Sequence, residues 1–419
     1  MKYIFLLLLC FVICVNLFFL HKNYVSGNFL DENIIGDASH YLEIAKNLKS
    51  FGVYSDNNSS VPTESATWRP PFYPFVLSVF LFISDNVLFL VLIKIIFQYT
   101  LIFFGCYLLY YNRLISNKVF LIGSFLLVEP YFLKYSYTFL SESFTASLLF
   151  LFFIFSLITL VKNKYYFQSI FSGFLCVLTH PIVVFYVFIV LFILLAKLFL
   201  IKRSLAFFYA FLFLFLLIIW PMRNLLTFDK GLFFTTSQGA ALSKGWNEKV
   251  YTEFNNTDGD LGDESLNLKY LINSNYETID SELERSKILT SATVNFIYHN
   301  GIKGNLNIVK RKIFSNFIPY PEKSKEGIIE NLGTIFRSFY LLFGLFLLSQ
   351  TFFKTSYNSL HFKLFYFLIY MSQTLMSILI YTGLRFNSVY NLIFLFILIY
   401  YISTSKWKKI NVQSNNIDK

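Results

Sequence analysis

Two short polar segments near the start of the chain contain the residues best suited to chemistry. Residues 36–41 read GDASHY and residues 68–74 read WRPPFYP, and both lie in one loop between apolar runs. Asp37 is a candidate general base, because a hydroxyl or amine that attacks a sugar carbon must lose a proton. One carboxylate on the face opposite the leaving group suffices for an inverting displacement. Asp31 and Glu32 are rival carboxylates in the same loop.

Asp37 also has a structural interpretation. The segment 41–48 reads YLEIAKNL, and its apolar positions form one stripe on a short helix. Such a helix is expected to lie flat on a membrane surface, and an Asp just before it would cap its free backbone N–H groups. Partial desolvation at the interface would raise the pKa of Asp37 toward a value useful for a base. Both roles stay open.

Three arginines lie near one predicted face of the membrane. They are Arg69, Arg223 in WPMRN (220–224) and Arg385 in GLRF (383–386). An arginine at a helix end commonly extends to the interface at little cost. The alternative is a cationic site for a lipid phosphate, because the planar guanidinium binds phosphate oxygens in pairs. We expect Arg223 to be the principal phosphate ligand, assisted by Arg69 and Arg385.

Four further residues are candidates for a supporting role. Glu142 begins an apolar run, so it should be paired or functional, and it can cap a helix or hold an arginine. His180 precedes a proline at a helix break, where a structural role is the commoner one, but it is also a candidate ligand of the donor phosphate. Tyr41 and Tyr73 flank the loop and are candidate contacts of the acceptor.

Composition sets the class of protein. The 419 residues are 56% hydrophobic and only 14% charged, whereas soluble domains carry about 25% charged residues. Apolar runs of about twenty residues recur, which indicates an all-α polytopic membrane protein rather than a barrel. The net charge of +11 comes from cationic clusters at helix ends, the positive-inside pattern, and is not a nucleic-acid signal. The four cysteines lie in apolar runs and imply no disulfide or metal site.

The apolar runs predict ten or eleven transmembrane helices. Residues 3–20 form the first, with a cleaved signal peptide as the rival interpretation, and residues 71–84 are expected to be a juxtamembrane or half-inserted helix. The other expected spans are 87–110, 119–135, 139–160, 165–179, 181–200, 205–220, 328–350, 362–382 and 387–403. The expected parts are a transmembrane catalytic core (1–220) with a first outer loop (21–70), an extracytoplasmic domain (221–327) containing a helix at 279–298, carboxy-terminal helices (328–405) and a cytoplasmic tail (406–419).

Other motifs are missing or weak. The sequence contains no Walker loop, dinucleotide fingerprint or zinc-binding helix. Asp258-Gly259-Asp260 is similar to the metal-binding Asp-x-Asp of nucleotide-sugar enzymes, but we expect it to face away from cytoplasmic nucleotide sugars. No cofactor is expected, and dependence on a divalent metal stays open.

The order of the motifs resembles a known family. GDAxxYLxIAxNL (36–48), GVYS (52–55), RPPxYP (69–74), LSE (140–142), LTHP (178–181), WPMRN (220–224) and RF (385–386) are similar to segments of GT-C fold glycosyltransferases, in the bacterial branch of the protein O-mannosyltransferase and lipid A aminoarabinose transferase superfamily. Three departures are His180, where the family commonly has Arg, Trp220-Pro221, whose order is inverted, and the final Arg motif, which is incomplete at Arg385-Phe386.

The resemblance implies a function and a location. The donor would be a polyprenyl-phosphate sugar at the extracytoplasmic side of the inner membrane, and Asp37 would be the catalytic base. We therefore expect an inverting glycosyltransferase whose acceptor is a lipid, glycan or protein. Two rivals are a lipid or polysaccharide transporter, which predicts charges near mid-membrane, and an O-antigen polymerase or ligase, which predicts active residues in the large outer loop. The sequence does not specify the sugar, acceptor, linkage or oligomeric state.

Overall fold

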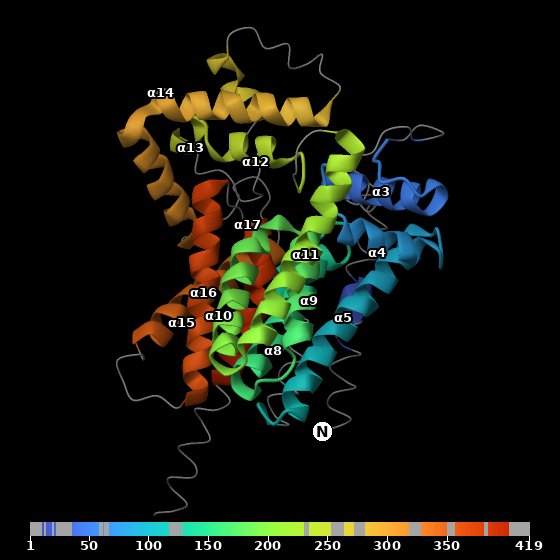
Figure 1. Ribbon diagram of the computed structural model, residues 1–419, viewed down its shortest axis with the longest axis vertical. Coiled ribbons are helices and arrows are strands. Elements are labelled where there is room, and N and C mark those ends of the chain that lie inside the picture. The colour runs from blue at the N-terminus through green and yellow to red at the C-terminus, as the bar shows by residue number, and fades with distance from the viewer. Residues whose placement is uncertain are drawn as a thin grey trace, which may run out of the picture.

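The protein is seen here in a computed structural model. The structure describes residues 36–57, 67–116, 129–229, 234–252, 264–271, 281–317, 328–349, 357–380 and 384–401, together with residues 11, 14–18, 21, 62 and 126. All regular secondary structure in these ranges is helical. Most helices form one bundle, and the others lie across one end of it (Figure 1).

Five helices of the described chain are long and apolar enough to cross a membrane. They are α5 (Val87–Tyr111), α8 (Glu142–Lys162), α10 (Val184–Ile201) with the preceding turn η2 (Pro181–Val183), α11 (Arg203–Phe228) and α16 (Tyr357–Leu379). Each coincides with an expected span, because an apolar run of this length can satisfy its backbone in lipid only as a helix. The chain is therefore a helical, multi-pass membrane protein.

Other expected spans form shorter helices. The structure has α4 (Phe72–Leu81), α9 (Tyr166–Thr179), α15 (Ile328–Ser349) and a final segment made of α17 (Leu384–Asn387), η6 (Ser388–Tyr390) and a helix that ends at Tyr401. The ten residues of α4 agree with the short helix expected at 71–84. About two thirds of residues 3–20 lie outside the described residues. Within the span expected at 119–135, the described residues are mainly 129–135, which include the start of α7 (Pro130–Ser136). The total of ten or eleven spans stays a prediction.

The bundle is built around α8. Nineteen of its residues are buried, and it packs against α5, α9 and η6. Phe153 makes edge contacts with Phe365 of α16 and Phe396 of the final helix. The turn before α8 is held by Lys94, a fully buried residue of α5 whose ammonium donates to the carbonyls of Tyr135 and Thr138. These contacts fix where α8 begins, and therefore where Glu142 lies.

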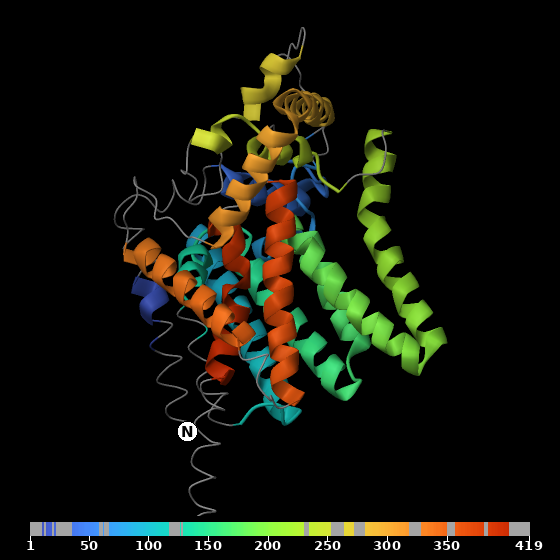
Figure 2. The same cartoon turned by 90° about the vertical axis from the view of Figure 1, so that its left-hand side faces the viewer.

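A second group of helices covers one end of the bundle. It contains α12 (Gln238–Gly245), α13 (Lys249–Thr252), η3 (Glu264–Tyr270) and α14 (Glu282–Phe317), whose orange ribbon lies above the bundle in Figure 2. The helix expected at 279–298 is thus confirmed but longer, and it kinks at Gly301. Lys312 Nζ donates to Ile380 O at 2.5 Å and Trp246 Nε1 donates to Leu379 O at 3.0 Å. The covering helices therefore hold the end of α16. Asp258 and Asp260 lie outside the described residues.

The first loop forms α3 (Asp37–Phe51). Its predicted stripe is confirmed, since Tyr41, Leu42 and Ala45 are buried, but the stripe packs on α4 and the bundle instead of on lipid. The helix begins earlier than expected, so Asp37 is its first residue and Gly36, at a φ of 64°, takes the cap position. Glycine tolerates that angle. A carboxylate in the first turn is also favoured by the helix dipole.

Candidate active site

Two arginines from distant parts of the chain bind Asp37. Arg69 Nη2 donates to Asp37 Oδ1, and Arg385 Nη2 donates to Asp37 Oδ2 at 2.7 Å. Arg69 lies in the loop before α4, and Arg385 lies in α17 near the end of the chain. The residues predicted to be the base and two of the phosphate ligands thus meet at one point. Asp37 makes ion pairs in place of the capping role that the sequence left open.

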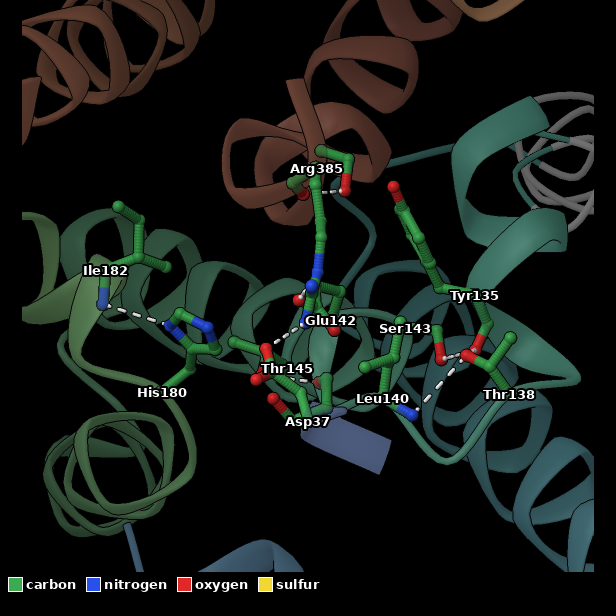
Figure 3. Close-up of polar contacts among 12 residues, drawn as sticks. Asp37, Tyr135, Thr138, Leu140, Glu142, Ser143, Thr145, His180, Ile182 and Arg385 are labelled. Carbon is green, nitrogen blue, oxygen red and sulfur yellow. Dashed lines mark hydrogen bonds and ion pairs between the residues drawn. The ribbon is translucent and has the colours of Figure 1, made fainter. Parts of the chain in front are cut away.

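Glu142 holds the second arginine from its other side. Arg385 Nε donates to Glu142 Oε1 at 2.5 Å, and the Glu142 side chain is only 1% exposed. Figure 3 shows Arg385 extending toward Glu142 and Asp37 from the helix above them. The sequence left open whether Glu142 caps α8 or holds an arginine, and the structure gives the second. Glu142 Oε2 is buried and has no hydrogen-bond partner within the described ranges.

The charges around Asp37 decide its protonation. Burial alone would raise the pKa of the carboxyl, but the positive charges of Arg69 and Arg385 and their hydrogen bonds outweigh burial and hold the pKa below its ordinary value. The sequence argument considered desolvation alone and expected a raised pKa, so that expectation was wrong. Asp37 is therefore ionised at neutral pH, and while both ion pairs persist it is a weak base.

Asp37, Arg69 and Arg385 lie on the wall of a cavity of about 300 Å³. That volume is at the lower end of the range typical of small-molecule sites. The cavity lies where α3, the loop before α4, the break between α9 and α10, α12 and α17 converge. The lining side chains with polar atoms are Asp37, His40, Tyr41, Trp68, Arg69, His180, Ser237, Lys244 and Arg385. Two of the three predicted arginines therefore share one cavity with Asp37.

Arg223 does not line this cavity. Its guanidinium lies over the rings of Trp220, at 4.8 Å, and Tyr54, at 5.4 Å. Tyr54 in turn donates from its hydroxyl to the carbonyls of Arg69, at 2.9 Å, and Pro70, at 3.1 Å. Arg223 thus supports the loop that carries Arg69. Its expected role as the principal phosphate ligand has no geometric support, because α11 places it behind that loop.

The two predicted tyrosines support the ion pairs. Tyr41 lines the cavity, and its hydroxyl lies 3.1 Å from Ser141 Oγ. The Arg69 guanidinium lies 5.4 Å from the centroid of the Tyr41 ring. Tyr73 is fully buried, and its ring meets the Tyr41 ring edge-on at 5.0 Å. The pair fixes the side of α3 next to α8. Tyr73 therefore lies behind the cavity and not on its surface.

His180 has the structural role that the sequence gave as the commoner one, and its role as a phosphate ligand stays a prediction. Its Nδ1 accepts a hydrogen bond from the backbone N–H of Ile182 at 3.2 Å, which caps the turn η2 (Figure 3). Because Nδ1 accepts, the neutral ring carries its proton on Nε2. The ring also lines the cavity and lies 5.5 Å from the ring of Phe386. His180 can therefore present an N–H group to a ligand.

The first loop and the covering helices are joined beside the cavity. Glu282 Oε2 accepts hydrogen bonds from Thr67 N at 3.2 Å and from Thr236 Oγ1 at 2.8 Å. Thr236 N also donates to Thr67 O at 3.1 Å. Burial raises the pKa of Glu282 above its ordinary value, although these hydrogen bonds oppose the shift. The loop that carries Arg69 and the helix that carries Lys244 are therefore held together.

Sequence reasoning missed three polar residues at or beside the cavity. His40 follows Asp37 by one helical turn, and its Nδ1 lies 2.8 Å from Asp56 Oδ2. The histidine was visible in the GDASHY segment, but nothing local linked it to Asp56. Lys244 reaches the cavity from α12. No sequence signal marked Lys244, because only the packing of the outer helices brings it there.

The fold and the site define a class: a helical, multi-pass membrane protein with a charged cavity at one end of its bundle. Comparison with models of protein families, with curated proteins and with solved structures found no match. In the part of the chain that the structure describes, no three histidine, cysteine, aspartate or glutamate side chains are grouped so that they could hold a metal ion.

Proposed function

We propose that this protein is a membrane glycosyltransferase that moves a sugar from a polyprenyl-phosphate carrier to an acceptor. The observation that carries the proposal is the junction of Asp37 with Arg69 and Arg385 on the wall of one cavity. The motif order that resembles GT-C glycosyltransferases supports it, because the three residues come from three of those motifs. The GT-C arrangement of the bundle is part of the same proposal.

The chemistry of the cavity suits a phosphate leaving group. Arg69 and Arg385 present planar donors that can bind phosphate oxygens in pairs. As the sugar–phosphate bond breaks, negative charge grows on the phosphate, and donors already fixed in place stabilise it strongly. The ring carbon becomes cationic in the same transition state. The ionised carboxylate of Asp37 holds both donors in position, and its negative charge would stabilise that cation in a sugar bound beside it.

The distribution of charge supports a direction for the cavity. Glu142, at the cavity end of α8, lies about 30 Å from Lys162 at the other end, at 1.5 Å per residue. Lys202 and Arg203 follow the far end of α10, which begins near His180. Lysine and arginine concentrate on the cytoplasmic side of membrane proteins. We therefore propose that the cavity opens to the extracytoplasmic side, where flipped polyprenyl-phosphate sugars would be the donors.

The test is transfer from a labelled donor. Proteoliposomes containing the protein are supplied with a panel of radiolabelled polyprenyl-phosphate sugars, and loss of label from the carrier is measured. We expect the wild-type protein to discharge at least one donor and Asp37→Asn to lower that rate by at least about 100-fold, the scale of a transition-state interaction. Asp85→Asn, which alters a carboxylate 75% exposed and paired with Lys49, is the matched control. Near-normal discharge by Asp37→Asn would refute the proposal, and so would a wild-type protein that leaves every donor intact.

A further inference from the structure

A histidine–aspartate pair lies beside the ion pairs of Asp37. His40 is on α3, one turn after Asp37, and its ring lines the same cavity. Its Nδ1 lies 2.8 Å from Oδ2 of Asp56, which follows the end of α3. The side chains of His40 and Asp56 are 40% and 24% exposed, so the histidine is open to the cavity while its partner is more enclosed.

The pairing sets which nitrogen of His40 can accept a proton. The hydrogen bond with His40 holds the pKa of Asp56 below its ordinary value in spite of burial, so Asp56 is ionised at neutral pH. An ionised carboxylate only accepts hydrogen bonds. His40 must therefore donate from Nδ1, and the neutral ring keeps its lone pair on Nε2. A carboxylate that orients an imidazole in this tautomer is the arrangement of a general base.

Asp37 is poorly placed for the same task. Both of its oxygens accept charged hydrogen bonds from arginines, and the two positive charges reduce its affinity for a proton. A general base is most effective when its pKa is close to the working pH. Asp37 is therefore suited to stabilising positive charge in this cavity but is a weak base. Another residue is better suited to remove the proton of the acceptor.

We infer that His40, oriented by Asp56, is a further catalytic residue that accepts the proton of the acceptor. The inference rests on the proposed glycosyl transfer. In that step the acceptor oxygen forms a bond to the anomeric carbon as the bond from that carbon to the phosphate oxygen breaks. The electron pair of the broken bond leaves with the polyprenyl phosphate, bound by Arg69 and Arg385. The acceptor proton moves to Nε2 of His40, which becomes an imidazolium ion beside Asp56.

Acidic and basic groups from several elements surround His40. Asp56 follows α3, Asp37 lies on the same helix, and Glu282 approaches from α14 and interacts electrostatically with both members of the pair. These three are acidic groups at or beside the cavity. The opposing cations are Arg69 from the loop before α4, Arg385 from α17 and Lys244 from α12, and the first two are already paired with Asp37. Tyr41 and His180 are the other titratable residues on the described cavity wall.

The test compares two nucleophiles. Water must lose a proton when it takes the sugar, whereas azide ion has none to lose. Proteoliposomes with a labelled polyprenyl-phosphate sugar that the wild-type protein discharges are assayed for free sugar and for glycosyl azide. We expect His40→Gln to lower hydrolysis by about 10²–10⁴-fold, the usual contribution of a general base, with little change in KM for the donor. It should form glycosyl azide at close to the wild-type rate. Asp56→Asn should give the same pattern with a smaller loss.

Two further variants make the result decisive. Asp37→Asn should lose both reactions, because it disturbs the groups that stabilise the leaving phosphate. His299→Gln, an exposed histidine on α14 whose Nδ1 lies 2.7 Å from Asn295 O, is the matched control and should behave like the wild-type protein. The inference is overturned if His40→Gln hydrolyses the donor normally, or if it loses both reactions equally. Glycosyl azide formation that survives in Asp37→Asn would make Asp37 the base. A wild-type protein that discharges no donor to either nucleophile would instead refute the glycosyltransferase proposal.

Discussion

The contact between Arg385 and Glu142 gives the sharpest prediction about stability. Arg385→Met removes the guanidinium and leaves the Glu142 carboxylate buried, at 1% exposure, without its positive partner. Breaking a buried pair in this way costs about 3–5 kcal/mol. Asp37 adds little to that cost, because it is 31% exposed and keeps Arg69. The magnitude therefore comes almost entirely from one enclosed carboxylate.

Removing both charges should restore most of the loss. A buried ion pair replaced by apolar side chains of similar volume is often neutral in stability. We expect Arg385→Met with Glu142→Leu to be more stable than Arg385→Met alone, with a coupling energy of about 2–3 kcal/mol in a double-mutant cycle. The measurement is equilibrium unfolding of the purified protein in mixed micelles, followed by helical circular dichroism.

An exposed pair provides the control for this cycle. Lys46 and Glu43 lie 2.7 Å apart on α3, and their side chains are 49% and 23% exposed. Solvent screens such a pair, so its cycle should give a coupling energy of at most about 0.5 kcal/mol. If the two substitutions at Arg385 and Glu142 were simply additive, the buried contact would not stabilise the junction, and the placement of Arg385 against α8 would be wrong.

Two more predictions follow from the residues around the cavity. Arg223→Ala removes the guanidinium over the Trp220 ring, so it should lower the unfolding free energy by about 0.5–1 kcal/mol. The KM for a discharged donor should stay within about twofold of the wild-type value. A tenfold higher KM would instead place Arg223 at the phosphate. The lowered pKa of Asp56 means that its pairing stabilises the fold above the ordinary carboxyl value of about 3.9 and that this stabilisation is lost as pH falls through the lowered value. The difference in thermal stability between wild type and Asp56→Asn should therefore shrink below about pH 4, and a difference that widens there would contradict the pairing with His40.

Local patterns in the sequence predicted most of the helices correctly. The apolar runs at 87–110, 139–160, 181–200, 205–220 and 362–382 all contain long helices in the structure. The stripe in 41–48 also predicted α3. These predictions succeed because chain length and side-chain periodicity act over a few turns of one helix. The start of α3 was predicted too late, since the stripe began at Tyr41, whereas a positive φ at Gly36 lets the helix begin at Asp37.

The sequence predicted some of the residues of the candidate site. Asp37, Arg69 and Arg385 stood out as charged residues beside apolar runs, and a charge at such a position must be paired or functional. The sequence did not predict which arginine binds which carboxylate. Arg223 and Arg385 looked alike in the sequence, yet α11 turns the first onto Trp220 and Tyr54, while α17 directs the second to Glu142 and Asp37.

The sequence by itself determined that this is a helical membrane protein with a few charges at the ends of its apolar segments, because hydropathy and length leave no other way to satisfy the backbone in lipid. Only the tertiary structure decided which of those charges meet. Arg385 lies 348 residues from Asp37 and 243 from Glu142 along the chain, and His40 finds Asp56 across the end of α3. Contacts of this kind depend on how the helices pack. The packing is determined by contacts throughout the whole bundle and not by any one segment.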